Sequence, residues 1–443
     1  MSRRTLVEDR PLSSYETHLE ILNHNYSTWF IVFISRIKGR LYEEIVRQAL
    51  DLVQCRHPHL NSRIVGSLDN PHFDSKGTYK IPLRVVKTAS WQKIVTEELN
   101  EKIDSSQGLM RAVLVQPSNE NNINYLITTV HHAIIDGLSC IRLHQDILTY
   151  CQQIASGTQI NQLPYLSTLP PINTLLPKSM KGFKGFIKSR FFLWKLMLKT
   201  LWYQPETLGF EKYVAVKLRR CGIIHKQLNK TLTQQLNNVC KSQKTTVQAA
   251  LCAAMLFATA TKIAHLKKRT KVHVNCRSAV NLRRRLNPII SHEELGMLAS
   301  VLPSFHTLQK NTSFWEVARE VRQELKSGLK SGEIFTNVLM SEQMLKFRSA
   351  RANKATVGIT NMGKVNIPTN YGPFELESIH GATSMTAFGG TFIAVVTIYQ
   401  GEMLINFVFS EPSISYKTMG VLADKVISYL TEICQCKDSY FLE

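Results

Sequence analysis

The chain has few acidic residues and lacks several features that would assign it to a common class. Asp and Glu number 33 against 54 Lys and Arg, so the formal net charge is +21 at pH 7. The nine cysteines include no Cys-x-x-Cys pair, so we expect reduced thiols, no disulfide framework and no metal site. No run of about 18 or more apolar residues occurs, and the first residues lack the apolar stretch of a secretory signal. We therefore expect a cytoplasmic protein without a membrane span.

The positive charge favours an anionic partner, which leaves nucleic acid, an anionic membrane or a phosphate-rich cofactor. Zinc-finger spacing and RNA-recognition signatures are missing, so nucleic acid ranks last. Coenzyme A and phosphopantetheine carriers are anionic partners of the phosphate-rich kind. Charge alone does not choose among these partners.

The length and the pattern of apolar residues predict two α/β halves. The 443 residues exceed the roughly 250–300 residues at which single cores stop growing. Alternating strand and helix signals run through both halves, with strands expected at Val214–Leu218 and Ile223–Leu228, among others. We place an N-terminal half at 1–176, a crossover at 177–210 and a C-terminal half at 211–443. A helix over 246–263 is apolar on most sides and is expected to be buried.

The crossover contains a basic amphipathic segment, residues 181–202. It interleaves lysines with aromatic residues more densely than a solvated helix requires. Three interpretations remain open: a solvated crossover helix, a membrane-surface anchor, and a docking face for an acyl carrier. We favour contact with a membrane or a lipid substrate, and expect a protein that is peripheral at an anionic membrane.

The segment His131-His132-Ala-Ile-Ile-Asp136-Gly137 is the strongest chemical signal. The strand Tyr125–Val130 leads into it and a helix follows Gly137, so its side chains are held at a strand end. An imidazole with a pKa near ambient pH suits the base that takes a hydroxyl proton during acyl transfer. If the acyl group passes directly from donor to acceptor at one imidazole nitrogen, both substrates must reach that nitrogen, which implies a tunnel.

The alternative interpretation is that the residues of this segment have structural roles only. Both histidines would then be packed core residues, and Asp136 would be only a helix N-cap, for which Asp before Gly137 is well suited. We hold the structural role for His131, because adjacent residues of a strand point to opposite faces. For His132 we favour the general base.

The segment resembles the active-site motif of the condensation and chloramphenicol acetyltransferase-like superfamily. Three further stretches resemble motifs of that family: Arg56-His57-Pro58-His59-Leu60, Val280–Pro288 followed by Gly296, and Thr360-Asn361-Met362-Gly363. The resemblance is strongest to free-standing polyketide-associated and alcohol acyltransferases. The plant-type Asp-Phe-Gly-Trp-Gly motif is missing, since the nearest stretch is Ala387-Phe-Gly-Gly390.

The resemblance implies two chloramphenicol acetyltransferase-like halves, each a mixed sheet flanked by helices, with a tunnel between them. It implies that His132 is the base, that Asp136 pairs with Arg283, and that Gly137 leaves room for the substrate. A buried Asp136 also needs a cation on physical grounds. We interpret Arg284 and Arg285 as a solvated basic face.

Thr360 and Asn361 are weaker candidates. Asn361 could donate a hydrogen bond to the oxyanion that forms on the thioester carbonyl, or it could simply be a turn residue before Gly363. Other histidines lack ligand spacing and are interpreted as structural: His57, His59, His144, His273 and His380.

We therefore expect an acyltransferase that forms an ester from an acyl thioester and an alcohol. The donor would be acyl-CoA or a phosphopantetheine-linked acyl group, bound as a substrate, with no resident cofactor. The alternatives are an amide-forming condensation enzyme, a lipid acyltransferase like wax ester or diacylglycerol synthases, and a non-catalytic module that binds acyl carriers. We expect a monomer.

Overall fold

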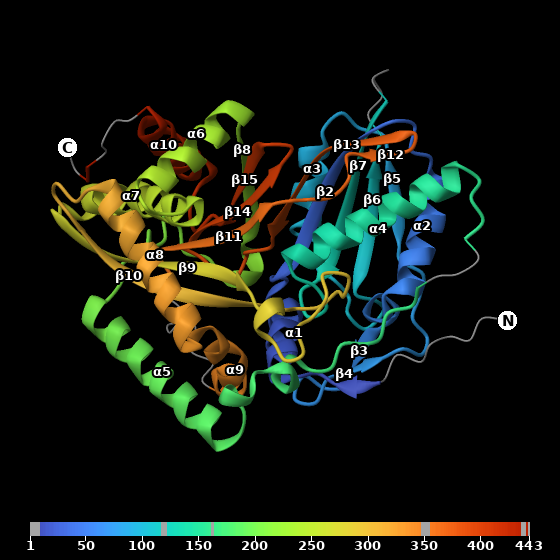
Figure 1. Cartoon of the computed structure of the whole chain (residues 1–443), viewed down its shortest axis with the longest axis horizontal. Helices are drawn as coiled ribbons and strands as arrows, with labels where there is room; N and C mark the ends of the chain where they lie inside the picture. Colours follow the sequence, from blue (N-terminus) through green and yellow to red (C-terminus); the bar gives the residue numbers. More distant parts are fainter. Residues whose placement is uncertain (1–8, 117–121, 161–163, 347–354, 436–439, 442–443) are drawn as a thin grey trace. The chain divides into compact units, whose positions relative to one another are not determined.

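The structure, a computed structural model, describes residues 9–116, 122–160, 164–346, 355–435 and 440–441 (Figure 1). The chain forms two compact units, each assembled from three segments. Unit 1 comprises Met1–Leu175, Arg283–Leu298 and Val365–Ser384, and unit 2 comprises the rest. The boundaries expected from the sequence differ from these two units, because they placed residues 283–298 and 365–384 in the C-terminal half.

Unit 1 is built on a six-stranded mixed sheet in which only the β5–β6 pair is parallel. The strands, in spatial order, are β12 (Asn370–Tyr371), β13 (Phe374–Thr383), β2 (Phe30–Lys38), β7 (Ile123–His131), β6 (Met110–Val115) and β5 (Leu83–Val86). A small sheet adds β1 (Arg10–Pro11), β4 (His72–Asp74) and β3 (Arg63–Val65). Figure 1 shows β13, in orange, beside the blue β2, so a late segment of the chain completes the sheet of the early ones.

The α-helices in the described part of unit 1 are α1 (Ser14–Tyr26), α2 (Glu43–Arg56), α3 (Trp91–Glu98) and α4 (Gly137–Ala155). Helix α4 packs against α2 and against the strands β2 and β13, whereas α3 packs against β7. Short 3-10 turns follow α2, precede α5 and lie between β9 and β10: η1 (Pro58–Asn61), η2 (Ile172–Leu175) and η5 (Arg283–Arg285).

Unit 2 has a second six-stranded mixed sheet, with β9–β11 and β11–β14 parallel and the other pairs antiparallel. Its strands, in spatial order, are β10 (Ala299–Gln309), β9 (Lys271–Asn281), β11 (Val357–Lys364), β14 (Phe392–Tyr399), β15 (Glu402–Glu411) and β8 (Arg220–Leu228). The predicted fold class, mixed sheets flanked by helices, is confirmed.

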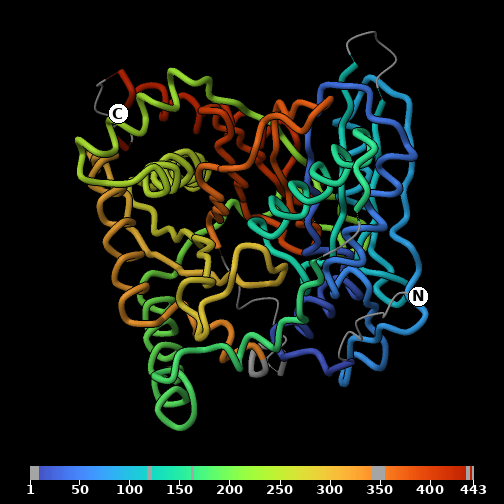
Figure 2. The backbone as a smooth tube through the Cα atoms, turned by 45° about the vertical axis from the view of Figure 1, so that its right-hand side comes forward, coloured from blue at the N-terminus to red at the C-terminus, as the bar shows by residue number. Residues whose placement is uncertain are grey.

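The described residues of unit 2 form the α-helices α5 (Gly182–Tyr203), α6 (Lys230–Ser242), α7 (Val247–Lys267), α8 (Phe314–Ser331), α9 (Thr336–Lys346) and α10 (Tyr416–Cys434). Its 3-10 turns are η3 (Lys178–Met180), η4 (Val216–Leu218) and η6 (Glu333–Phe335). Residues 214–218 are therefore not the strand that their apolar pattern predicted. Helix α7 packs against α8, α10, β9 and β11, and Figure 2 shows it nearly end-on within unit 2.

Helix α7 is also the one helix of the described residues that is long and apolar enough to cross a membrane. Its most apolar window is 78% buried inside the protein, which is typical of a core helix. The expected tunnel between the halves concerns how the two units are arranged, and it stays a prediction.

Candidate functional site

The strand β7 sets which way His131 points. Along β7, Thr128 bonds to His144 of α4 through its hydroxyl (2.8 Å), whereas Thr129 donates to Glu98 of α3 (2.6 Å). Successive side chains of a strand lie on opposite faces of the sheet. His131, the last residue of β7, therefore lies on the face of Thr129.

His131 is held in the interior by its own partners. Its Nε2 lies 2.9 Å from a carboxylate oxygen of Glu20 in α1, and its Nδ1 accepts the Ala133 N–H at 3.1 Å. Glu20 also accepts the hydroxyl hydrogen of Ser105 at 2.8 Å. Because both ring nitrogens are engaged and the side chain is fully buried, His131 has the supporting arrangement that the sequence predicted.

His132 lies in the turn between β7 and α4, and only one of its nitrogens has a protein partner among the described contacts. The Nδ1 atom lies 2.7 Å from the Ile135 carbonyl oxygen, which can only accept. Nδ1 must therefore carry the hydrogen, and Nε2 keeps its lone pair. Burial lowers the pKa of His132 below its ordinary value, although the Ile135 carbonyl and Asp136 oppose this shift. The ring is thus neutral at pH 7 and able to accept a proton.

Trp29 packs on the His132 ring, and no pattern in the sequence indicated this contact. The two rings are stacked, with centroids 5.5 Å apart and planes inclined at 26°. Trp29 has a backbone φ of 63°, which is uncommon for a bulky residue. Its N–H donates to the Ser384 carbonyl at 3.1 Å, and the Thr28 hydroxyl donates to the same oxygen at 3.0 Å. The segment that follows β13 therefore holds the Trp29 backbone in this conformation.

Asp136 forms four hydrogen bonds and is 3% exposed. One oxygen accepts the Ser139 N–H at 2.9 Å and Arg283 Nη2 at 3.1 Å, and the other accepts Arg283 Nη1 at 2.7 Å and the Leu298 N–H at 3.1 Å. Burial raises the pKa of the Asp136 carboxyl, but Arg283 and the backbone donors outweigh burial and hold this pKa below its ordinary value. The predicted Asp136–Arg283 pair is confirmed, and Asp136 caps α4 as well.

Ser139 is a second member of this cluster that sequence reasoning missed. Its hydroxyl oxygen lies 2.6 Å from Arg283 Nη2 and 3.1 Å from both the N–H and the carbonyl of Gly296. Ser139 is the third residue of α4, where its own N–H is capped by Asp136. These hydrogen bonds therefore connect segment 283–298 to the beginning of α4, and α4 follows the turn that carries His132.

The remaining candidates separate into two groups. Gly137 is the first residue of α4 and is partly exposed, and Arg284 and Arg285 are exposed, as the sequence predicted. Thr360 and Asn361 lie on β11 of unit 2 and are partly exposed. The Asn361 side-chain oxygen accepts the Gly363 N–H at 2.8 Å, so the turn role is realised. A role in binding an oxyanion stays a prediction.

The Arg56–His57 motif supports α4. Arg56 Nε and His57 Nε2 both approach the same oxygen of Asp146, at 3.3 and 2.9 Å. Arg56 also pairs with Glu293 at 3.2 Å, and Arg142 pairs with Asp146 at 2.7 Å. This part of the family-like motif therefore has a structural role in the protein.

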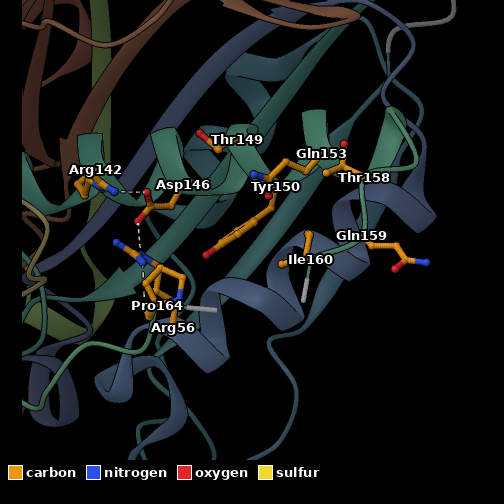
Figure 3. A pocket seen from close by; sticks show the side chains of 10 residues that line it. All are labelled: Arg56, Arg142, Asp146, Thr149, Tyr150, Gln153, Thr158, Gln159, Ile160 and Pro164. Carbon is orange, nitrogen blue, oxygen red and sulfur yellow. Dashed lines mark hydrogen bonds and ion pairs between the residues drawn. The ribbon is translucent and has the colours of Figure 1, made fainter. Parts of the chain in front are cut away.

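A cavity of about 430 Å³ opens beside this network, and Figure 3 shows ten side chains around it. Arg56 and Arg142 line the cavity together with Asp146, which pairs with both of them. His132 does not line it. Since the two cations are already matched by carboxylates, the cavity is a poor site for an anion. Across the described residues, no cluster of three or more His, Cys, Asp or Glu side chains is arranged to hold a metal ion.

Two family models match the chain, one in each half of the sequence. The condensation domain matches residues 16–167, which include the histidine motif. The C-terminus of phthiocerol/phthiodiolone dimycocerosyl transferase matches residues 219–408, which include Arg283.

Two curated proteins are similar at low identity. A probable alcohol acetyltransferase of Fusarium pseudograminearum is 22% identical over 312 residues, which cover 64% of this chain and 62% of that protein. Wax ester synthase/diacylglycerol acyltransferase 5 of Arabidopsis thaliana is 19% identical over 41% of this chain and 38% of its own length. The chain thus spans less than two thirds of these relatives.

Solved structures share the fold over nearly the whole chain. Trichothecene 15-O-acetyltransferase from Fusarium sporotrichioides superposes with a TM-score of 0.75 at 13% identity, covering 97% of both chains. Polyketide synthase associated protein 5 from Mycobacterium tuberculosis gives a TM-score of 0.67 at 18% identity, covering 96% of this chain and 99% of its own. The first condensation domain of the CDA synthetase gives 0.71 at 14% identity, covering all of this chain and 99% of its own.

Proposed function

The chain belongs to the condensation and chloramphenicol acetyltransferase-like superfamily, and we propose that it is an acyltransferase that joins an acyl group to an alcohol with His132 as general base. The observation that carries this proposal is the state of the His132 ring. Its Nδ1 is occupied by the Ile135 carbonyl, and burial lowers its pKa, so Nε2 is a neutral acceptor at pH 7.

The proposed reaction needs no covalent enzyme intermediate. His132 Nε2 takes the hydroxyl proton as the alcohol oxygen attacks the thioester carbonyl, which gives a tetrahedral oxyanion. The C–S bond then breaks, and the imidazolium returns the proton to the leaving sulfur. The products are the ester and the free thiol, and His132 regains its starting state.

Asp136 has a positioning role in this proposal. Its oxygens are all directed to Arg283, Ser139 and Leu298, so it is not a second base. Its contacts hold the beginning of α4, and with it the turn that carries His132. The negative charge beside the ring also favours the imidazolium that forms after proton transfer.

We propose acyl-CoA or a carrier-bound phosphopantetheine thioester as the donor. The net charge of +21 suits an anionic donor of either kind. Alcohol acceptors are favoured because the curated relatives are named as an alcohol acetyltransferase and a wax ester synthase. Amide formation is the second candidate, because the condensation model matches the half that carries His132.

Thiol release from a panel of acyl-CoA donors with alcohol or amine acceptors tests the proposal. Acceptor-dependent release is expected for the native protein, with ester identified by mass spectrometry. His132→Ala should lower the rate at least about 100-fold, the lower range of a positioned general base. His265→Gln, an exposed histidine at the end of α7, is the matched control and should keep full activity. Undiminished transfer by folded His132→Ala would overturn the assignment.

A further inference from the structure

Helix α5 presents a broad apolar surface to solvent. It is 22 residues long, or roughly 33 Å at 1.5 Å per residue. Trp202 is 86% exposed and Phe183 is 77% exposed, which is far from the burial usual for such side chains. The other exposed large apolar residues of α5 are Phe186, Ile187, Phe191, Leu193, Trp194, Met197, Leu198 and Leu201.

The opposite side of α5 packs against the protein through two small residues and one aromatic side chain. Gly185, Ser189 and Phe192 are its buried residues. A Cβ atom at Gly185 would lie 2.1 Å from the Met180 carbonyl oxygen, so glycine permits the close approach to η3. Helix α5 also packs against α9, β10 and η6. Figure 2 shows it in green at the edge of unit 2.

Two lysines of α5 belong to this inner side. Lys195 pairs with Glu333 at 3.2 Å, and Lys199 pairs with Glu324 at 2.7 Å. Both lysines are partly buried. The helix is therefore inverted relative to an ordinary surface helix, since its aromatic side faces outward and part of its charge faces the protein. The sequence predicted membrane contact for the segment 181–202 as a whole, and these two ion pairs remove Lys195 and Lys199 from that contact.

The other basic residues of the segment are exposed. Lys181, Lys184 and Lys188 follow one another at helical spacing along the border of the outer side, and Arg190 lies within 5.7 Å of the Phe186 ring centroid. Residues 178–205 contain no Asp or Glu. The outer surface of α5 thus combines apolar side chains with positive charge alone.

We propose that the outer surface of α5 lies in the interface of a bilayer that contains anionic lipid. Aromatic and aliphatic side chains would enter the boundary between headgroups and acyl chains, while the three border lysines reach phosphate and carboxylate groups of the lipids. The helix lies on the membrane and does not span it, because its basic residues interrupt every apolar run. This inference goes beyond the proposed reaction and does not depend on it.

Charge distinguishes the bilayer from a second copy of the chain. A symmetric pair of α5 helices would bring positive charges together with no acidic residue of either helix between them. An acidic carrier would match the charge, but it would leave most of the apolar length of α5 without a partner. An anionic bilayer matches both features at once.

Sedimentation with vesicles tests the proposal. The full chain should bind vesicles of phosphatidylcholine with phosphatidylserine at low salt, bind pure phosphatidylcholine more weakly, and lose affinity as salt rises. Replacing Phe186, Trp194 and Trp202 by Ser should abolish binding. Leu266→Ser with Val421→Ser is the matched control, because both residues are exposed apolar side chains elsewhere in unit 2.

A second pair of variants measures the contribution of the border lysines to membrane binding. Replacing Lys181, Lys184 and Lys188 by Gln should weaken binding to phosphatidylserine vesicles about 100-fold, the sum expected for three basic residues at an anionic surface. The control replaces three exposed lysines elsewhere in unit 2 and should bind like the native chain: Lys241, Lys271 and Lys310.

Three results would overturn the proposal: native protein that stays in the supernatant with phosphatidylserine vesicles, serine variants that bind like the native chain, or light scattering that shows a native dimer which the serine variants dissociate. Transfer to a water-soluble alcohol is measured in parallel and should be unchanged in all these variants. Loss of membrane binding and loss of the proposed reaction are thereby distinguished.

Discussion

At the scale of single residues, the protonation state of His132 decides the chemistry. Burial lowers its pKa below the ordinary value of 6.5, and only the neutral ring can take a proton. Activity should therefore be constant near pH 7 and fall in acid as pH passes down through the pKa of the folded state. We expect the acid limb of kcat/KM to have an apparent pKa below 6.5. An acid limb above 6.5 with a non-ionising acceptor would contradict a buried His132 as the base.

The Asp136 carboxylate is predicted to matter for stability as well as rate. Its removal in Asp136→Ala leaves the Arg283 guanidinium, 1% exposed, without its anion, and should reduce the free energy of unfolding by about 3–5 kcal/mol. Asp51→Ala, which removes a partly exposed partner of Arg47, should cost at most about 1 kcal/mol. Urea unfolding of both variants measures the difference.

The pH dependence of this contribution has a definite sign. The pKa of Asp136 is lowered in the folded state, so its contribution is present above the pKa of the unfolded chain and is lost as pH falls through the folded value. The stability gap between native protein and Asp136→Ala should therefore narrow in acid. A gap that stayed constant into strong acid would show that lost packing, and not the carboxylate charge, causes it.

Trp29 is predicted to position the His132 ring. Trp29→Gly removes the stacked ring but suits the backbone φ of 63°, so the loss of backbone strain offsets part of the lost packing. We expect a fall in kcat larger than the change in KM, together with a shifted acid limb of the pH profile. Trp91→Gly, which removes the Trp stacked on Tyr125, is the control and should leave the pH profile in place. An unchanged acid limb in Trp29→Gly would assign Trp29 a packing role alone.

At the scale of elements, two helical glycines predict opposite responses to alanine. A Cβ atom at Gly185 of α5 would meet the Met180 backbone at 2.1 Å, whereas one at Gly420 of α10 would have no neighbour within 4 Å. Gly185→Ala should displace the first turn of α5 and lower the melting temperature. Gly420→Ala should raise stability by up to about 1 kcal/mol, the difference in helix propensity. Calorimetry of the two variants measures both melting temperatures. Equal changes of melting temperature in the two variants would contradict the close approach of α5 to η3.

At the scale of the whole molecule, unit 1 cannot be completed by the first 175 residues. Strand β13 pairs with β2 over most of its length, and Arg283 comes from segment 283–298. A fragment of residues 1–176 would leave the β2 edge open and Asp136 without its cation. We expect this fragment to aggregate or to lack cooperative unfolding by circular dichroism, while the full chain unfolds cooperatively. A monomeric fragment with a sharp melting transition would contradict the prediction.

The sequence by itself determined the elements whose own pattern is strong, and the local motif. The strand expected at Ile223–Leu228 lies within β8, and the apolar character of residues 246–263 predicted the burial of α7. The inward direction of His131 followed from the period of a strand, and the capping role of Asp136 from its place before Gly137. These features depend on neighbours in the chain, which periodicity and capping describe.

Tertiary structure decided what depends on contacts between distant segments. Residues 214–218 have the apolar content of a strand, yet none of them lies in a strand and residues 216–218 form the 3-10 turn η4, because an apolar pattern alone supplies no neighbouring strand. The insertion of β13 beside β2, the packing of Trp29 on His132 and the outward aromatic side of α5 leave no signature in a local window. Each of these three features depends on which surface a distant segment of the chain covers. Sequence periodicity shows only that a side chain is apolar, and it does not show which other residues that side chain contacts.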